Sequence, residues 1–146
     1  LLDGTRSKNG TIFLDMNNAV DFTDENSVLH GHHMRNGSMF AQIENYKKQE
    51  FFDENPYGYL ITPEKVFRLE FFAGIVKKAS SVPSNFADLE AKDAWVNEMR
   101  SASTFETDLY PTSEDMRFVS LSTCDYTIDD GRYMLSARMV EITPQQ

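Results

Sequence analysis

Val119-Ser120-Leu121-Ser122-Thr123-Cys124 is a β-prone run that carries the only cysteine of the sequence at its end. A single thiol cannot form an internal disulfide, so its most notable use is as a nucleophile. Eight residues further on, Arg132 opens a second β-prone run that extends to Val140. If the two runs pair as a hairpin across residues 125–131, the guanidinium returns close to the sulfur.

Both residues also have ordinary explanations. A free cysteine is among the most buried residue types and is often an inert core residue, and an arginine in a strand is often a surface residue. Here the cysteine stands at the end of its run and is followed by polar Asp125-Tyr126-Thr127. This position favours the rim of a sheet, where an arginine neighbour would raise the population of the thiolate.

All three histidines, His30, His32 and His33, lie in one cluster at the end of another β-prone segment. Because strand side chains alternate, His30 and His32 point to one face and His33 to the other. A thiolate, a histidine that carries protons and an arginine that stabilises an oxyanion would together suit acyl transfer. A zinc site would need three or four converging ligands, with the cysteine recruited from a distant strand, so we predict no metal.

Length and charge limit the class of protein. A chain of 146 residues fits one domain and buries roughly 68–70% of its unfolded surface, which is enough for an ordinary core. The net charge of −9 and the pI near 4.7 argue against nucleic acid or an anionic membrane as a partner, since both need clustered Lys and Arg. No membrane-span or signal-peptide pattern occurs and the chain does not begin with Met, so we expect an excised soluble domain.

The apolar pattern predicts many short strands with two helical insertions. One helical insertion follows Ser38 and ends before Asn55-Pro56, and the strongest helix runs from Ser84 or Asn85 to about Ser101, just before the cysteine-bearing run. The longest strand, 66–77, is expected to place one apolar row on a single face. That row is Phe67, Leu69, Phe71, Ala73 and Ile75. The predicted strands are 11–14, 27–32, 57–62, 66–77, 116–123 and 132–140, and they indicate a mainly antiparallel β-barrel with helices outside.

Several motifs of this chain, in order, resemble those of class B sortases. The stretch Val28-Leu29-His30-Gly31-His32-His33-Met34, followed by Gly37-Ser38-Met39-Phe40, looks like their His motif. Leu121-Ser122-Thr123-Cys124 with Gly131-Arg132 looks like their Cys and Arg motifs. Residues 11–15 and 51–57 match further family segments, so the resemblance covers nearly the whole chain.

The resemblance implies a closed antiparallel β-barrel of about eight strands with peripheral helices, one of them a long helix before the cysteine-bearing strand. It implies that residues 1–146 form a single sortase catalytic domain from which the family's N-terminal helices and membrane anchor are absent. The expected location is the extracellular face of the cell membrane of a Gram-positive bacterium. Membrane contact would come only through an N-terminal anchor that this chain lacks.

The resemblance further implies a cysteine transpeptidase that needs no cofactor. Cys124 would attack the carbonyl carbon of Thr in a C-terminal NPxTx-like sorting signal of a secreted protein, and an amine of a peptidoglycan precursor or cross-bridge would resolve the thioacyl-enzyme. His32 would carry the protons and Arg132 would hydrogen-bond the substrate carbonyl or oxyanion. Ser122, on the same strand face as Cys124, would help to position the substrate or would be a simple strand hydroxyl. His30 departs from the family, whose members often carry Tyr two residues before the catalytic His.

Three alternatives stay open. A cysteine hydrolase would use water in place of the amine, and a pilus-assembling sortase would join protein subunits. A non-catalytic β-barrel binding module would use none of Cys124, His32 and Arg132 for chemistry.

Overall fold

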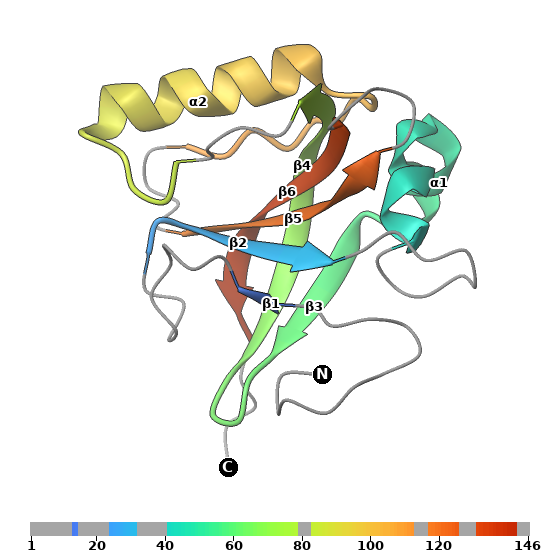
Figure 1. Cartoon of the computed structure of the whole chain (residues 1–146). Coiled ribbons are helices and arrows are strands. Elements are labelled where there is room, and N and C mark those ends of the chain that lie inside the picture. The colour runs from blue at the N-terminus through green and yellow to red at the C-terminus, as the bar shows by residue number, and fades with distance from the viewer. Residues whose placement is uncertain are drawn as a thin grey trace.

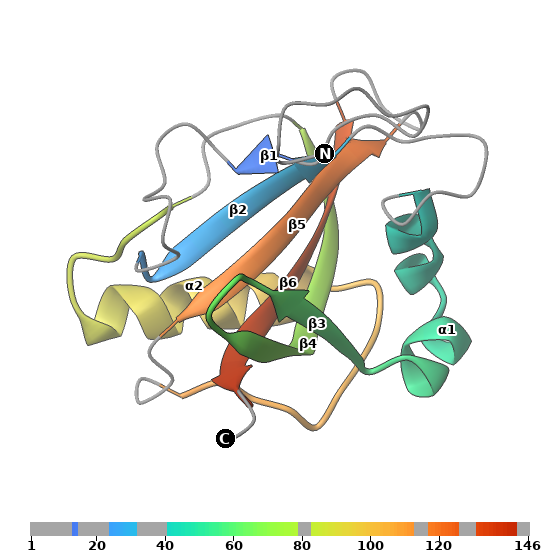
Figure 2. The ribbon, with the colours of Figure 1, turned by 90° about the horizontal axis from the view of Figure 1, so that it is seen from below.

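The computed structural model describes residues 13–14, 24–31, 41–78, 83–112, 117–125 and 131–142. Within these residues six strands form one sheet in the spatial order β1-β2-β5-β6-β4-β3. In Figure 1, β2 and β5 run nearly across β4 and β6, and Figure 2 shows the same strands from below, so the sheet is strongly curled. The strands are β1 (Phe13–Leu14), β2 (Asn26–Gly31), β3 (Tyr57–Ile61), β4 (Val66–Lys78), β5 (Phe118–Asp125) and β6 (Gly131–Glu141).

The predicted mainly β fold is confirmed, and the pairing adds one feature. The pairs β1/β2, β3/β4, β4/β6 and β5/β6 are antiparallel, whereas β2 and β5 run parallel. Parallel neighbours need a long crossover, and here the chain between β2 and β5 supplies β3, β4 and the helices. The described residues leave β1 and β3 at the two edges of the sheet, so a closed barrel of about eight strands stays a prediction.

The long helix before the cysteine-bearing strand is confirmed as α2 (Leu89–Ala102). Its N-cap is Asp88, whose carboxylate accepts a hydrogen bond from the amide of Ala91 at 2.8 Å. The predicted start at Ser84 or Asn85 was wrong, because the Asn85 side chain instead accepts from the amide of Glu25 at 3.1 Å. Asn85, which could have capped the helix, thus links the segment before α2 to the residue before β2.

Two short helices follow the histidine segment, the 3₁₀ helix η1 (Ala41–Lys47) and α1 (Gln49–Glu54). The chain leaves the helical conformation at Asn55, directly before Pro56, as predicted. The helices lie beside the end of β5 in Figure 1, whereas α2 lies along another side of the sheet.

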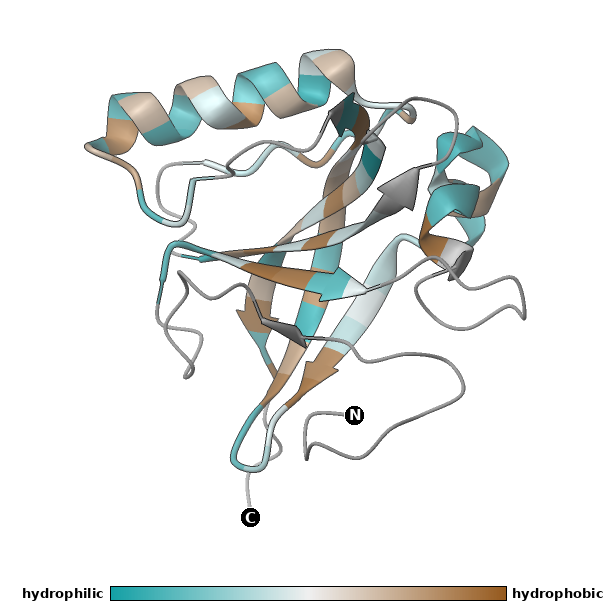
Figure 3. Ribbon diagram, in the orientation of Figure 1, coloured by the Kyte–Doolittle hydropathy of each residue, from teal (hydrophilic) through white to brown (hydrophobic). Residues whose placement is uncertain are grey.

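Each face of the sheet carries its own apolar core. Figure 3 shows that the strands are richer in apolar residues than the exposed side of α2. The η1-side core lies under η1 and α1. It consists of Leu29, Ile43, Tyr46, Phe52, Leu69, Phe71, Phe105, Val119, Tyr133, Leu135 and Ala137. The α2-side core lies under α2. It consists of Phe72, Ala73, Ile75, Trp95, Val96, Met99, Phe118 and Met134.

A β-bulge in β4 divides this strand between the two cores. The register against β6 shifts between Phe71 and Ala73, so Phe72 is the extra residue. The predicted row on one face was therefore wrong for Ala73 and Ile75, which lie in the α2-side core while Phe71 lies in the η1-side core. One inserted residue reverses the alternation of every side chain that follows it.

Candidate active site

The predicted hairpin brings Cys124 and Arg132 together. The two residues are direct register partners on the antiparallel strands β5 and β6, and the next pair is Asp125 with Gly131. Residues that are directly opposite share a face of the sheet, with Cβ atoms about 4.5–5.5 Å apart. Cysteine and arginine therefore stand side by side at the end of the β5/β6 ladder.

Arg132 lies in the middle of a row of three strands. Its partner on β4 is Lys77, so two cationic residues and the cysteine occupy neighbouring positions across β4, β6 and β5. The Arg132 side chain is half-buried and donates to the carbonyl of Gly131 at 3.0 Å. The register thus places Lys77, Arg132 and Cys124 in one row across the three strands, and the role of Cys124 as a nucleophile stays a prediction.

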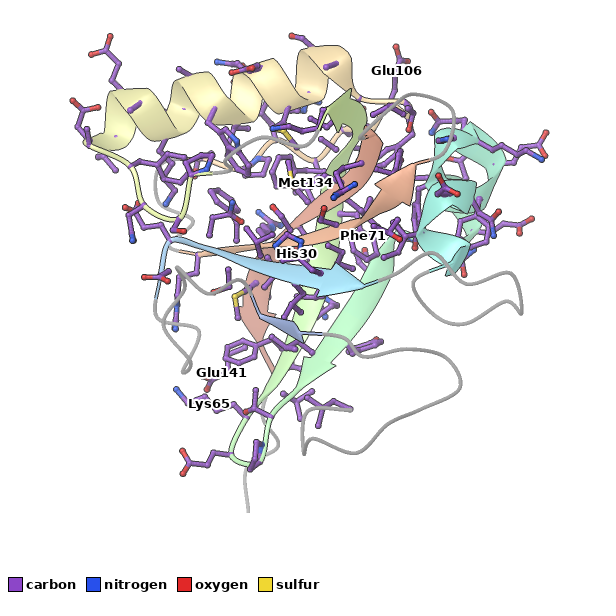
Figure 4. The ribbon with its side chains drawn as sticks, viewed as in Figure 1. His30, Lys65, Phe71, Glu106, Met134 and Glu141 are labelled. Atoms are coloured by element: carbon purple, nitrogen blue, oxygen red, sulfur yellow. The ribbon has the colours of Figure 1, made fainter. Side chains whose placement is uncertain are left out.

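Ser122 lies in the next row on the same face. It is paired with His30 on β2 and with Met134 on β6, and Figure 4 shows His30 and Met134 over the middle of the sheet. Ser122 is buried, with 5% of its surface exposed. Its predicted contact with substrate stays a prediction.

The predicted histidine comes from the end of β2. His32 and His33 lie outside the described residues, but β2 ends at Gly31, whose register partner is Thr123, the residue before Cys124. Because parallel strands end at the same edge, β2 and β5 deliver their last residues side by side. The sequence separates His30 from Ser122 by most of the chain, and the sheet makes these two residues register partners.

A buried polar network fixes the three strands that carry the site residues. The Ser120 hydroxyl donates to Oδ1 of Asn26 at 2.9 Å and lies 2.7 Å from the Ser136 hydroxyl. Since Ser120 has one hydrogen and gives it to Asn26, Ser136 is the donor to Ser120. The network crosses β2, β5 and β6, and it was missed in the sequence, where a serine in a strand carries no distinguishing signal.

Two residues in the described part of the chain, Glu70 and Tyr46, have a shifted pKa. Burial raises the pKa of Glu70, but hydrogen bonds and charge from Arg138 (2.6 Å) and Arg68 (2.9 Å) outweigh it and hold that pKa below its ordinary value. Burial raises the pKa of Tyr46 to about 12. Both groups contribute to the stability of the fold.

A pocket of about 620 Å³ opens between α1 and the segment that follows α2. Its lining comes from Phe52, Asp53, Phe72, Arg100, Phe105, Glu106, Thr107 and Asp108. Of the predicted site residues whose side chains the structure describes, neither Ser122 nor Arg132 belongs to this lining. Within the described ranges no group of three or more His, Cys, Asp and Glu side chains is placed to hold a metal ion, and no described helix is long and apolar enough to cross a membrane.

Sortases of class B are among the known proteins similar to this chain. No family model matches the chain. Sortase B of Listeria monocytogenes serovar 1/2a is 25% identical over 139 residues, which cover 92% of this chain and 56% of that protein. The chain thus spans about half the length of this relative.

Solved structures agree in fold. The Staphylococcus aureus sortase B–substrate complex has a TM-score of 0.83 at 24% identity, covering 93% of this chain and 64% of that one. The X-ray structure of Clostridium perfringens sortase B has a TM-score of 0.82 at 33% identity, covering 92% of this chain and 75% of that one. With a relative this similar over three quarters of its length, and with the same curled sheet, the chain belongs to the class B sortase family.

Proposed function

We propose that the chain is a single catalytic domain that acts as a cysteine transpeptidase on secreted proteins with a C-terminal NPxTx-like sorting signal. The observation that carries the proposal is the direct pairing of Cys124 with Arg132 at the end of the β5/β6 ladder. The end of β2 beside Thr123 supports His32 as the third member. The solved complex of Staphylococcus aureus sortase B with a substrate supports substrate binding by this chain too.

In the first half-reaction the Cys124 thiolate attacks the carbonyl carbon of the signal's threonine. Arg132 donates hydrogen bonds to the oxyanion that develops, a contribution worth about 10²–10³ in rate when one such donor is lost. The bond to the following residue breaks as His32 gives a proton to the departing amine. The product is a thioester between Cys124 and the threonine.

In the second half-reaction an amine of a peptidoglycan precursor or cross-bridge attacks the thioester. His32 takes a proton from the attacking amine, the new amide forms, and Cys124 leaves as the thiolate. The proposed location is the outer face of the membrane of a Gram-positive cell, where signal and acceptor amine meet.

The test uses the 146-residue chain with a library of sorting-signal peptides and triglycine as acceptor, read by mass spectrometry. We expect a ligated product joined through threonine and, without acceptor, a thioester adduct on Cys124. The Cys124→Ala variant should give neither product while keeping the fluorescence of the buried Trp95. Cleavage that triglycine does not divert would identify a hydrolase, and full activity of Cys124→Ala would refute the assignment.

A further inference from the structure

Tyr133, the residue after Arg132, is the start of a partly buried chain of hydrogen bonds. Its ring is fully buried, and its hydroxyl lies 2.8 Å from the hydroxyl of Thr104, which donates to the carbonyl of Tyr46 at 2.9 Å. A hydroxyl has one hydrogen, so Tyr133 must be the donor to Thr104. The hydrogen bonds therefore run in one direction, from Tyr133 on β6, through Thr104 after α2, to the carbonyl of Tyr46 on η1.

The missing side chain of Gly74 on β4 leaves room for this tyrosine. A Cβ atom at position 74 would come within 2.9 Å of Cζ of Tyr133 and closer still to its hydroxyl oxygen. The same glycine holds the segment after α2, because its carbonyl accepts from the amide of Thr104 at 2.8 Å and its amide donates to the Ser103 hydroxyl at 3.1 Å. Tyr133 is thus held on two sides by groups that are themselves bonded together.

The position of Tyr133 in the β5/β6 ladder connects its hydrogen bonds and its packing against Gly74 to the candidate active site. Tyr133 is paired with Thr123, and these residues are 0% and 1% exposed. Beyond them the described part of the ladder holds two more pairs, Cys124 with Arg132 and Asp125 with Gly131. The ends of strands open more readily than their middles, and the buried pair of Tyr133 and Thr123 directly precedes the residues of the site.

We propose that Tyr133 is a positioning residue whose hydroxyl, through Thr104, holds the end of the β5/β6 ladder so that Cys124 and Arg132 stay opposite each other. This inference rests on the proposed function, because it assigns to Tyr133 the alignment of Cys124 with Arg132 that the proposed reaction needs. A misplacement of 1 Å can cost about 10²-fold in rate. For loss of one hydroxyl we expect a fall in kcat of about 10-fold.

The experiment compares variants that change the hydrogen-bond chain and little else. Tyr133→Phe and Thr104→Val should each lower kcat with KM within about twofold, because the binding surface is unchanged. The double variant should be no worse than either single one, and Thr104→Ser should restore activity. The matched control is Tyr46→Phe, which keeps the backbone carbonyl that accepts from Thr104 and loses only a partly buried hydroxyl, bonded to the carbonyl of Asn55 at 2.7 Å; it should keep kcat.

A second measurement separates this inference from the proposed function. The pH profile of Cys124 alkylation by iodoacetamide reports the cation beside the thiol without any turnover. We expect the profile to move to higher pH in Tyr133→Phe, in the direction given by Arg132→Gln, and not in Tyr46→Phe. If the parent chain gives no ligated product but this shift occurs, the transpeptidase assignment fails and the positioning role stands.

Two results would overturn the positioning role. One is a Tyr133→Phe variant with the kcat and alkylation profile of the parent. The other is an equal loss of kcat in Tyr46→Phe, which would show that any softening of the η1-side core has the same effect. In either case ligation by the parent chain would leave the transpeptidase proposal intact.

Discussion

Replacing Gly74 with Ala should be among the most destabilising small changes in this protein. The new methyl group would meet Cζ of Tyr133 at 2.9 Å and Cε1 of Phe105 at 3.1 Å. Overpacking of a close-packed core costs about 1–3 kcal/mol. Displacing the tyrosine also breaks its hydrogen bond to Thr104, worth about 1 kcal/mol, so we expect a total loss of about 2–4 kcal/mol in the free energy of unfolding.

The Tyr133→Phe background tests the cause of that loss. Removing the hydroxyl oxygen removes the closest contact and leaves the contacts at 2.9 and 3.1 Å, so Gly74→Ala should cost about 1–2 kcal/mol less in this background. Urea titration followed by the fluorescence of Trp95, the only tryptophan and 9% exposed, measures the parent, the two single variants and the double variant. A cost below about 0.5 kcal/mol, or strictly additive costs, would refute the steric reasoning.

Three other changes test the site and the charges around it. His32→Ala should reduce ligation far more than His30→Ala, and equal losses that added zinc reverses would indicate a metal site. Arg132→Lys should lower kcat and kcat/KM together, because lysine keeps the charge but not the planar pair of donors; near-parental ligation would contradict the oxyanion role. Glu70→Gln should cost about 2 kcal/mol at neutral pH, since a charged hydrogen-bond acceptor is lost. The pKa of Glu70 is lowered in the folded state, so the difference in the free energy of unfolding between the parent and Glu70→Gln should shrink as pH falls below the ordinary value of 4.5. A difference in urea titrations that does not depend on pH would contradict the ion-pair account.

The sequence predicted those parts of the fold that rest on local patterns. The hairpin of β5 and β6 follows from two β-prone runs close together in the chain, and its register sets Arg132 opposite Cys124. The amphipathic period of α2 and the stop before Pro56 are local signals of the same kind. The roles of Cys124, Arg132 and Ser122 stay predictions, and His32 lies outside the described residues.

What the sequence did not reveal depends on contacts between distant segments. The bulge at Phe72 is set by the pairing of β4 with β6, because an unbroken apolar run gives no sign of where the alternation reverses. The role of Tyr133 is equally hidden, since its partners Thr104 and Gly74 are remote in sequence and unremarkable in type. The hydroxyl of a buried tyrosine usually has a hydrogen-bond partner, and that partner is identified only once the fold is known.

The parallel pairing of β2 with β5 also has a consequence for the order of folding. The hydrogen bond between Ser120 and Asn26 joins residues 94 positions apart, and contacts of such separation slow folding to the millisecond-to-second range. During synthesis β2 must wait for β5 and β6 to emerge, so its edge stays open while the middle of the chain folds. We expect refolding to show helix formation first and the fluorescence of Trp95, which contacts Phe118 of β5, to change last.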